Sequence, residues 1–210
     1  TRDIPKPLLT VGEKPILARI LDQLEEGGVE SITISVYYRA EQVEAFVNAR
    51  NNKAKISFIR EPEPLGTAGS LMLMPGIEDE TTIVVNGDVV SQVDFNHLWN
   101  FHAEHGNDGT IAVSRYNVQI PFGVLKVGED GLFSGMEEKP TNSYFVAAGI
   151  YILSPQFSPL VQKGIPIDTP QLLEAGRQAG LRIGIAPLHE YWRDIGHPDD
   201  LAMANSENSS

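Results

Sequence analysis

The sequence predicts an α/β domain with a mainly parallel sheet, to which a smaller antiparallel part is added. Two patterns support this prediction. Short β-branched stretches alternate with amphipathic helical stretches over residues 15–105, and alternation at this spacing implies parallel pairing through right-handed crossovers. Strands with little helix between them then occupy residues 109–153, with Asp130-Gly131 as a typical hairpin turn. The length of 210 residues suits one domain of this kind.

The individual elements follow from apolar spacing and from the residues that end each stretch. A helix over residues 15–26 has apolar residues at helical spacing and ends at Gly27-Gly28. A short helix is expected to reach Met74, and residues 206–210 are expected to form a frayed tail. The other expected elements are strands at 31–37, 55–59, 82–85, 109–114, 123–127, 132–138, 144–153 and 181–187, and helices at 40–50, 95–105, 155–162, 169–179 and 198–204.

Composition excludes several classes of function. The chain has 16 basic and 28 acidic residues, a net charge of −12, so its surface repels nucleic acid and anionic lipid. It contains no cysteine, which excludes thiol and iron–sulfur chemistry and fits a cytoplasmic location. No apolar run is long enough to span a membrane. Residues 1–7 lack an initiator Met and an apolar core, so we expect no signal peptide and a chain that is entered midway.

Two aspartates are the strongest candidates for metal ligands. Asn86-Gly87-Asp88 directly follows an apolar strand, at the position where open α/β sheets bind ligands, and a carboxylate there suits Mg²⁺. The same tripeptide is also an ordinary turn. Asp194 lies 106 residues later, between Trp192 and Gly196, and offers a second carboxylate. Its alternative role is to precede or cap the helix that begins near residue 198.

Two lysines and one small-residue loop could contact phosphates or a base. Lys139 follows two acids at the end of a strand, and Lys6 lies between two prolines; each is either a phosphate contact or a surface lysine. The loop at 64–69, Pro-Leu-Gly-Thr-Ala-Gly, lies at the start of a helix, where backbone groups can bind a base edge or phosphate oxygens. It lacks the spacing of a dinucleotide fingerprint or a P-loop, so a plain helix start is equally compatible.

The order of these motifs resembles that of the sugar-1-phosphate nucleotidyltransferases, over about residues 5–205. Within that family the stretch at 115–124 looks most like bacterial members that carry CBS domains ahead of the catalytic domain. The motifs that carry the resemblance are Pro5-Lys6-Pro7-Leu8-Leu9, Val11-Gly12-Glu13-Lys14-Pro15, Leu65-Gly66-Thr67-Ala68-Gly69, Asn86-Gly87-Asp88, Pro121-Phe122-Gly123-Val124, Glu138-Lys139-Pro140, Ala148-Gly149-Ile150-Tyr151 and Trp192-Arg193-Asp194-Ile195-Gly196.

The resemblance implies a Rossmann-like catalytic domain over residues 1–205. A sugar 1-phosphate would attack the α-phosphorus of a nucleoside triphosphate, giving a nucleotide-sugar for surface glycans and releasing pyrophosphate. Asp88 and Asp194 would bind Mg²⁺, and Lys6 would meet a phosphate group. The implied substrate contacts are Leu65, Gly66 and Thr67 at the base, Gly123, Glu138 and Lys139 at the sugar phosphate, and Gly87 and Gly149 beside them.

The chain departs from the family pattern at two places. The Gly-rich loop that wraps the triphosphate and the first, central strand are expected upstream of Lys6, so we expect an N-terminally truncated domain that is inactive alone. Ala147 stands where relatives often carry Asn, which leaves the sugar unassigned. The loop at 64–69 resembles guanylyl members most, although uridylyl relatives share its Leu-Gly-Thr-Ala, so GTP is favoured over the other nucleotides.

Two other functions are compatible with the same sequence. One is a regulatory subunit that binds nucleotide-sugar without making it, against which both aspartates and Lys139 argue. The other is a metal-dependent glycosyltransferase, which needs a second acid two residues from Asp88, whereas Asn86 and Val90 occupy those positions. The expected partners are a nucleoside triphosphate and a sugar 1-phosphate, with the upstream segment, CBS domains and a second copy of the chain as further candidates.

Overall fold

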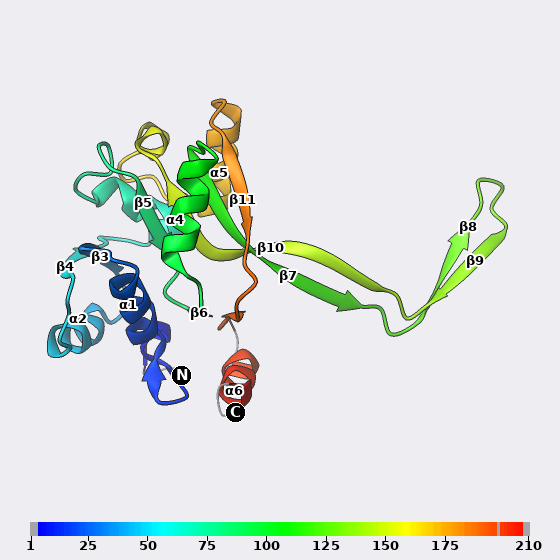
Figure 1. Cartoon of the computed structure of the whole chain (residues 1–210), viewed down its shortest axis with the longest axis horizontal. Helices are drawn as coiled ribbons and strands as arrows, with labels where there is room; N and C mark the ends of the chain where they lie inside the picture. The colour runs from blue at the N-terminus through cyan, green and yellow to red at the C-terminus, as the bar shows by residue number, and fades with distance from the viewer. Residues whose placement is uncertain (1–3, 197, 208–210) are drawn as a thin grey trace.

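The computed structural model describes residues 4–196 and 198–207 of the chain. Figure 1 shows a body of packed helices and strands from which a long β-arm projects to one side. The body contains a four-stranded mixed sheet, a smaller parallel pair of strands and the terminal segments. The arm is an extension of two strands of the central sheet.

The central sheet has the strand order β11-β7-β10-β5. The four strands are β5 (Thr82–Val85), β7 (Gly109–Gln119), β10 (Thr141–Leu153) and β11 (Ile183–Pro187). β11 runs parallel to β7, whereas β10 runs antiparallel to both β7 and β5.

The two faces of this sheet are covered by different elements. On β10, Ile150 and Ile152 point into one apolar cluster and Tyr151 and Leu153 into another, as the alternation of side chains along a strand requires. The first cluster includes residues of α1 (Ile16–Glu26), α2 (Ala40–Ala49) and α4 (Phe95–Glu104). The second includes residues of α3 (Gly66–Gly69), η2 (Ser70–Leu73), η3 (Pro155–Leu160) and α5 (Thr169–Gln178). The domain is therefore layered, with helices on both faces.

The N-terminal part forms a separate parallel pair, β3 (Ser31–Val36) with β4 (Lys55–Arg60). It packs against the same apolar cluster as β5, but within the described residues no strand pairs β3 with β5. η1 (Lys6–Leu8) and the short strands β1 (Thr10–Val11) and β2 (Lys14–Pro15) precede α1.

Two further short strands and the last helix complete the body. β6 (Val89–Ser91) follows β5 and pairs antiparallel with β12 (Trp192–Asp194). α6 (Pro198–Glu207) follows β12 and lies near the N-terminal segment (Figure 1). Asn205 on α6 accepts a hydrogen bond from the backbone N–H of Gly12 at 2.8 Å, so the two ends of the chain are joined.

The arm consists of two ribbons in series. The outer halves of β7 and β10 form the first ribbon, and β8 (Gly123–Val127) with β9 (Phe133–Glu138) form a hairpin at its end. The sequence predicts all four strands, but β7 and β10 are longer than expected. Polar residues such as Asn117 and Asn142 continue both strands because both faces of the extended arm are exposed to solvent.

The mixed α/β class is confirmed, whereas two details of the sequence prediction, the mainly parallel pairing and the start of the frayed tail, are wrong. Of the strand pairings in the described residues, only β3/β4 and β7/β11 are parallel, because β10 returns antiparallel between β5 and β7. The helix expected near 155–162 is present as a 3₁₀ helix, η3, which contains Pro159. α6 continues through Ser206 and Glu207, two residues into the expected frayed tail, whose last three residues lie outside the described residues. None of the described helices has the length and apolar character needed to cross a membrane.

Candidate active site

The fold brings Asp88 and Asp194 onto neighbouring backbone segments. β12 pairs with β6 so that Asp194 lies opposite Val89, and the backbone N–H of Ile195 donates to the carbonyl of Asp88 at 2.9 Å. Opposed residues in antiparallel strands are about 4.5–5.5 Å apart between Cα atoms. The pairing of β6 with β12 therefore brings together the backbones of two aspartates that are 106 residues apart in the sequence.

The turn that carries Asp88 is fixed by contacts with β10. The backbone N–H of Asn86 donates to the carbonyl of Gly149 at 2.8 Å. Gly149 has a φ of +71°, and a Cβ built there would lie only 2.8 Å from Cγ2 of Val89. Gly149 is thus needed for close packing between β10 and the turn.

Lys6 places a cation next to this turn. Its Nζ lies 3.8 Å from Oδ2 of Asp88 and donates to the carbonyl of Gly196 at 3.4 Å. The neighbouring Pro7 limits the space at Gly87, where a Cβ would lie 3.2 Å from the proline Cγ. The lysine side chain remains 55% exposed and the aspartate 31%, so both are accessible to a ligand. Three segments far apart in the sequence therefore meet around one ion pair.

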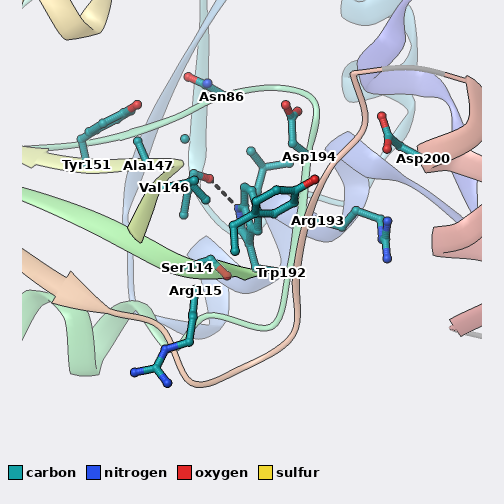
Figure 2. A pocket seen from close by; sticks show the side chains of 14 residues that line it. Asn86, Ser114, Arg115, Val146, Ala147, Tyr151, Trp192, Arg193, Asp194 and Asp200 are labelled. Carbon is teal, nitrogen blue, oxygen red and sulfur yellow. Dashed lines mark hydrogen bonds between the residues drawn. The ribbon is translucent and has the colours of Figure 1, made fainter. Parts of the chain in front are cut away.

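A cavity of about 500 Å³ lies at the junction of β10, β12 and the base of the arm. Figure 2 shows Asp194 and Asp200 on one side of this cavity and Asn86 and Tyr151 on another. Burial raises the pKa of the Tyr151 phenol, which therefore stays neutral at ordinary pH. Asp88 contacts Lys6 and is not among the lining residues. The other lining residues are Val89, Ser114, Arg115, Tyr116, Val146, Ala147, Ala148, Gly149, Trp192 and Arg193.

The strand that carries Asp194 is held by its neighbours in the sequence. The indole N–H of Trp192 donates to the carbonyl of Ala148 at 2.7 Å, which ties β12 to β10 (Figure 2). Arg193 forms an ion pair with Glu207 at 2.6 Å, and the Tyr191 hydroxyl donates to the same carboxylate. These hydrogen bonds lower the pKa of the Glu207 carboxyl and raise that of the Arg193 guanidinium. The ion pair therefore joins the strand to α6 across the neutral pH range.

The loop with Leu65, Gly66 and Thr67 lies next to the start of α5. Gly66 has a φ of +78°, and a Cβ there would lie 2.6 Å from the carbonyl oxygen of Ile167. The Thr67 hydroxyl accepts a hydrogen bond from the backbone N–H of Thr169 at 2.8 Å. The polar groups of Thr67 are thus engaged within the protein, and no described contact joins this loop to Asp88 or Asp194.

Gly123, Glu138 and Lys139 meet one another at the hairpin of the arm. Gly123 lies opposite Glu138, and the backbone N–H of Lys139 donates to the Phe122 carbonyl at 3.2 Å. Figure 1 shows this hairpin projecting away from β6 and β12, which flank Asp88 and Asp194. The structure thus divides the expected site residues into a group in the body and a group on the arm.

Several residues around the cavity were not identified from the sequence. Asp200 and Tyr116 lie in a helix start and an exposed strand, where neither carries a recognisable motif. Glu207 is one of several acids in the C-terminal stretch, and only the fold shows that it pairs with Arg193. The one available signal was the polar residue Ser114, which follows the buried part of β7.

A divalent cation fits the two aspartates by the chemistry of the donors. The described residues contain no group of three His, Asp or Glu side chains spaced to hold a metal. Mg²⁺ in phosphate-transferring enzymes is commonly bound by one or two carboxylates, and substrate phosphates and water complete its coordination. Asp88 and Asp194 supply that number of carboxylates on adjacent backbones.

Comparison with known proteins identifies the family. The nucleotidyl transferase family matches residues 1–210. The chain is 36% identical over 209 residues to mannose-1-phosphate guanylyltransferase catalytic subunit beta of Drosophila melanogaster, with 96% of this chain and 56% of that protein covered. It is 31% identical to mannose-1-phosphate guanyltransferase 2 of Candida glabrata, with 96% and 58% covered. The chain therefore spans little more than half the length of these relatives.

Solved structures share the fold over nearly the whole chain. HddC from Yersinia pseudotuberculosis, complexed with GMP-PN, has a TM-score of 0.75 and 26% identity, and 98% of this chain and 91% of that chain are covered. A putative glucose-1-phosphate thymidylyltransferase from Bacillus anthracis has a TM-score of 0.76 at 19% identity, which supports the fold alone. On the family match and the extent of these similarities, the chain belongs to the nucleotidyl transferase family.

Proposed function

We propose that this chain is the catalytic domain of a sugar-1-phosphate guanylyltransferase. The single observation that carries the proposal is that Lys6 pairs with Asp88, whose backbone adjoins the strand of Asp194, a residue that lines a cavity of about 500 Å³. The donor GTP is supported by relatives named as guanylyltransferases and by a neighbour complexed with GMP-PN. The product would be a GDP-sugar and the by-product pyrophosphate.

The proposed reaction needs positioning and charge neutralisation rather than a protein nucleophile. A phosphate oxygen of the sugar 1-phosphate forms a new bond to the α-phosphorus of GTP, and the bond from that phosphorus to the bridging oxygen of pyrophosphate breaks. Lys6 supplies a fixed positive charge beside the phosphates. Asp88 and Asp194 would hold Mg²⁺, which supplies further neutralisation of phosphate charge when bound.

We also propose roles for the residues that the fold places elsewhere. Leu65, Gly66 and Thr67 would contact the base, and the hairpin group of Gly123, Glu138 and Lys139 would contact the sugar phosphate. The second role requires the hairpin to approach Asp194 when substrate is bound. A Lys139→Ala variant that keeps the KM for sugar 1-phosphate unchanged would contradict it.

A strand from an upstream segment is proposed to lie between β3 and β5. Ile32 and Ile34 of β3 and Ile83 and Val85 of β5 pack around one apolar cluster, yet the two strands are not paired with each other among the described residues. A strand inserted there would join the two sheets into one. The same segment would supply the Gly-rich loop near Lys6 that the family resemblance implies.

The proposed function is tested by Mg²⁺-dependent release of pyrophosphate from GTP and mannose 1-phosphate. The assay compares this chain with a version that is extended by its natural upstream sequence. Asp194→Asn is expected to lower the rate about 100-fold or more, as the loss of a group that stabilises transition-state charge does. Asp79→Asn, at an exposed turn, is the matched control.

Two outcomes would contradict the proposal. Equal rates for Asp194→Asn and Asp79→Asn would show that the charge of Asp194 is not used in the reaction. Tight GTP or GDP-sugar binding without turnover, with every nucleotide and sugar phosphate supplied, would instead indicate a regulatory subunit. The sequence similarity does not favour that alternative or a glycosyltransferase over the guanylyltransferase.

A further inference from the structure

The arm, defined here as residues 115–147, exposes two apolar faces. On the first ribbon, Tyr116 lies directly opposite Tyr144, and Val118 lies on the same face. On the hairpin, Leu125 lies opposite Met136. All these side chains are between 41% and 60% exposed. Patches of this kind mark interaction surfaces.

The opposite face of each ribbon carries more polar side chains, although exposed Phe145 also lies on that side of the first ribbon. On the first ribbon the Ser143 hydroxyl donates to the side-chain oxygen of Asn117 at 2.6 Å, and Gln119 lies on the same side. On the hairpin Lys126 forms an ion pair with Glu137 at 3.8 Å. The hairpin is therefore amphipathic, as expected of a two-stranded sheet that packs on one side. The first ribbon has more of its exposed apolar side chains on the side of Tyr116, Val118 and Tyr144 than on the side of Phe145. A two-stranded ribbon alone is marginally stable in water, so its apolar face needs a partner.

We propose that this partner is the arm of a second copy of the chain, related by a twofold axis. The first-ribbon face of one copy packs against the hairpin face of the other, and the second contact repeats the first by symmetry. Both faces are then covered by surfaces that each chain already possesses. This proposal concerns assembly and does not depend on the proposed reaction.

The exposed area is sufficient for such a dimer. An aromatic side chain presents about 150–250 Å². Of the aromatic residues on the two apolar faces, Tyr116, Phe133 and Tyr144 are 55–71% exposed and thus leave roughly 400 Å² uncovered. Exposed Leu, Val and Met side chains of the hairpin bring the total to the order of 800 Å², which is what each partner buries in a standard interface.

The low net charge of the arm favours contact between the arms of two copies over contact between their bodies. The arm contains three basic and four acidic residues, a net charge of −1, whereas the whole chain has −12. Two arms can therefore meet without the like-charge repulsion that two bodies would experience. A twofold arrangement that separates the bodies and joins the arms satisfies both the apolar and the electrostatic requirement.

The test is the mass of the chain in solution, measured by light scattering at roughly micromolar concentration, where interfaces of this size associate. The chain is expected at twice its monomer mass of 23.0 kDa. Val118→Arg, on the apolar face, is expected to halve that mass. Gln119→Arg, the adjacent residue on the polar face, is the matched control and is expected to leave the dimer intact.

Phe133→Ser on the hairpin provides an independent variant. Phe133 is 71% exposed, so its loss leaves the folded body unchanged and is expected to halve the mass as well. Circular dichroism confirms that each variant is folded. A monomeric unmodified chain, or a dimer that persists in folded Val118→Arg and Phe133→Ser, would overturn the proposal.

Discussion

Replacing Gly149 by alanine tests the contact between β10 and the turn that carries Asp88. Gly149 has a φ of +71°, and an added Cβ would lie 2.8 Å from Cγ2 of Val89 and 2.9 Å from Nδ2 of Asn86. Two costs therefore add. One is the left-handed backbone conformation, and the other is the crowding of the turn by a methyl group.

The magnitude follows from these two costs. A left-handed conformation costs a residue with a side chain about 1–2 kcal/mol. Crowding in a packed region costs a further 1–3 kcal/mol or so. The free energy of unfolding of Gly149→Ala is therefore expected to fall by about 2–5 kcal/mol. Gly28 is the matched control, because it has a φ of +80° with no atom within 4 Å of an added Cβ. Gly28→Ala is therefore destabilised only by the left-handed backbone conformation.

Urea unfolding followed by tryptophan fluorescence measures both variants. The midpoint of Gly149→Ala is expected to lie below that of Gly28→Ala at an unchanged slope, since only stability changes. The difference between the two variants, about 1–3 kcal/mol, isolates the crowding. Equal destabilisation of the two variants would refute the reasoning, because it would show that the turn does not press against Gly149.

Two further variants test contacts outside this turn. Hydrogen bonds from Arg50 lower the pKa of the Glu25 carboxyl from 4.5 to about 2, so its ionised form stabilises the fold above about pH 4.5, and this stabilisation is lost as the pH falls toward 2. Glu25→Gln is expected to lower the free energy of unfolding by about 3 kcal/mol at pH 7. The urea midpoint of this variant is expected to depend less on pH between about pH 5 and pH 2 than that of the unmodified chain. Thr67→Val leaves the backbone N–H of Thr169 without its acceptor and is expected to cost about 1–3 kcal/mol of unfolding free energy in thermal melts, whereas unchanged stability would contradict that role.

Much of the fold follows from local sequence signals. The helix that ends at Gly27-Gly28 begins at Ile16, one residue from the predicted start, because apolar spacing and glycine act locally. The Asn86-Gly87-Asp88 turn likewise follows β5 directly, as predicted. The alternation of strands and helices led to a prediction of mainly parallel pairing, which is wrong, since the return of β10 between β5 and β7 depends on contacts distant in the sequence.

The candidate site was predictable only in part, for a similar reason. The residue types of Lys6, Asp88 and Asp194 indicate phosphate and metal chemistry, and the fold brings them together. Their roles stay predictions until activity is measured. No local sequence pattern predicts that Thr67 contacts α5 or that Lys139 lies on a projecting hairpin. Both features depend on how whole elements pack.

The site exists only when both ends of the chain are folded onto the body. Lys6 reaches the Gly196 carbonyl, and Gly12 is joined to Asn205, so the first and last segments stabilise each other across the turn that carries Asp88. Neither segment has a large apolar core of its own, and each depends on β6 and α1 for burial. The segments that carry the three charged groups are therefore brought together by tertiary packing, which makes the chemistry of the site dependent on the integrity of the whole domain.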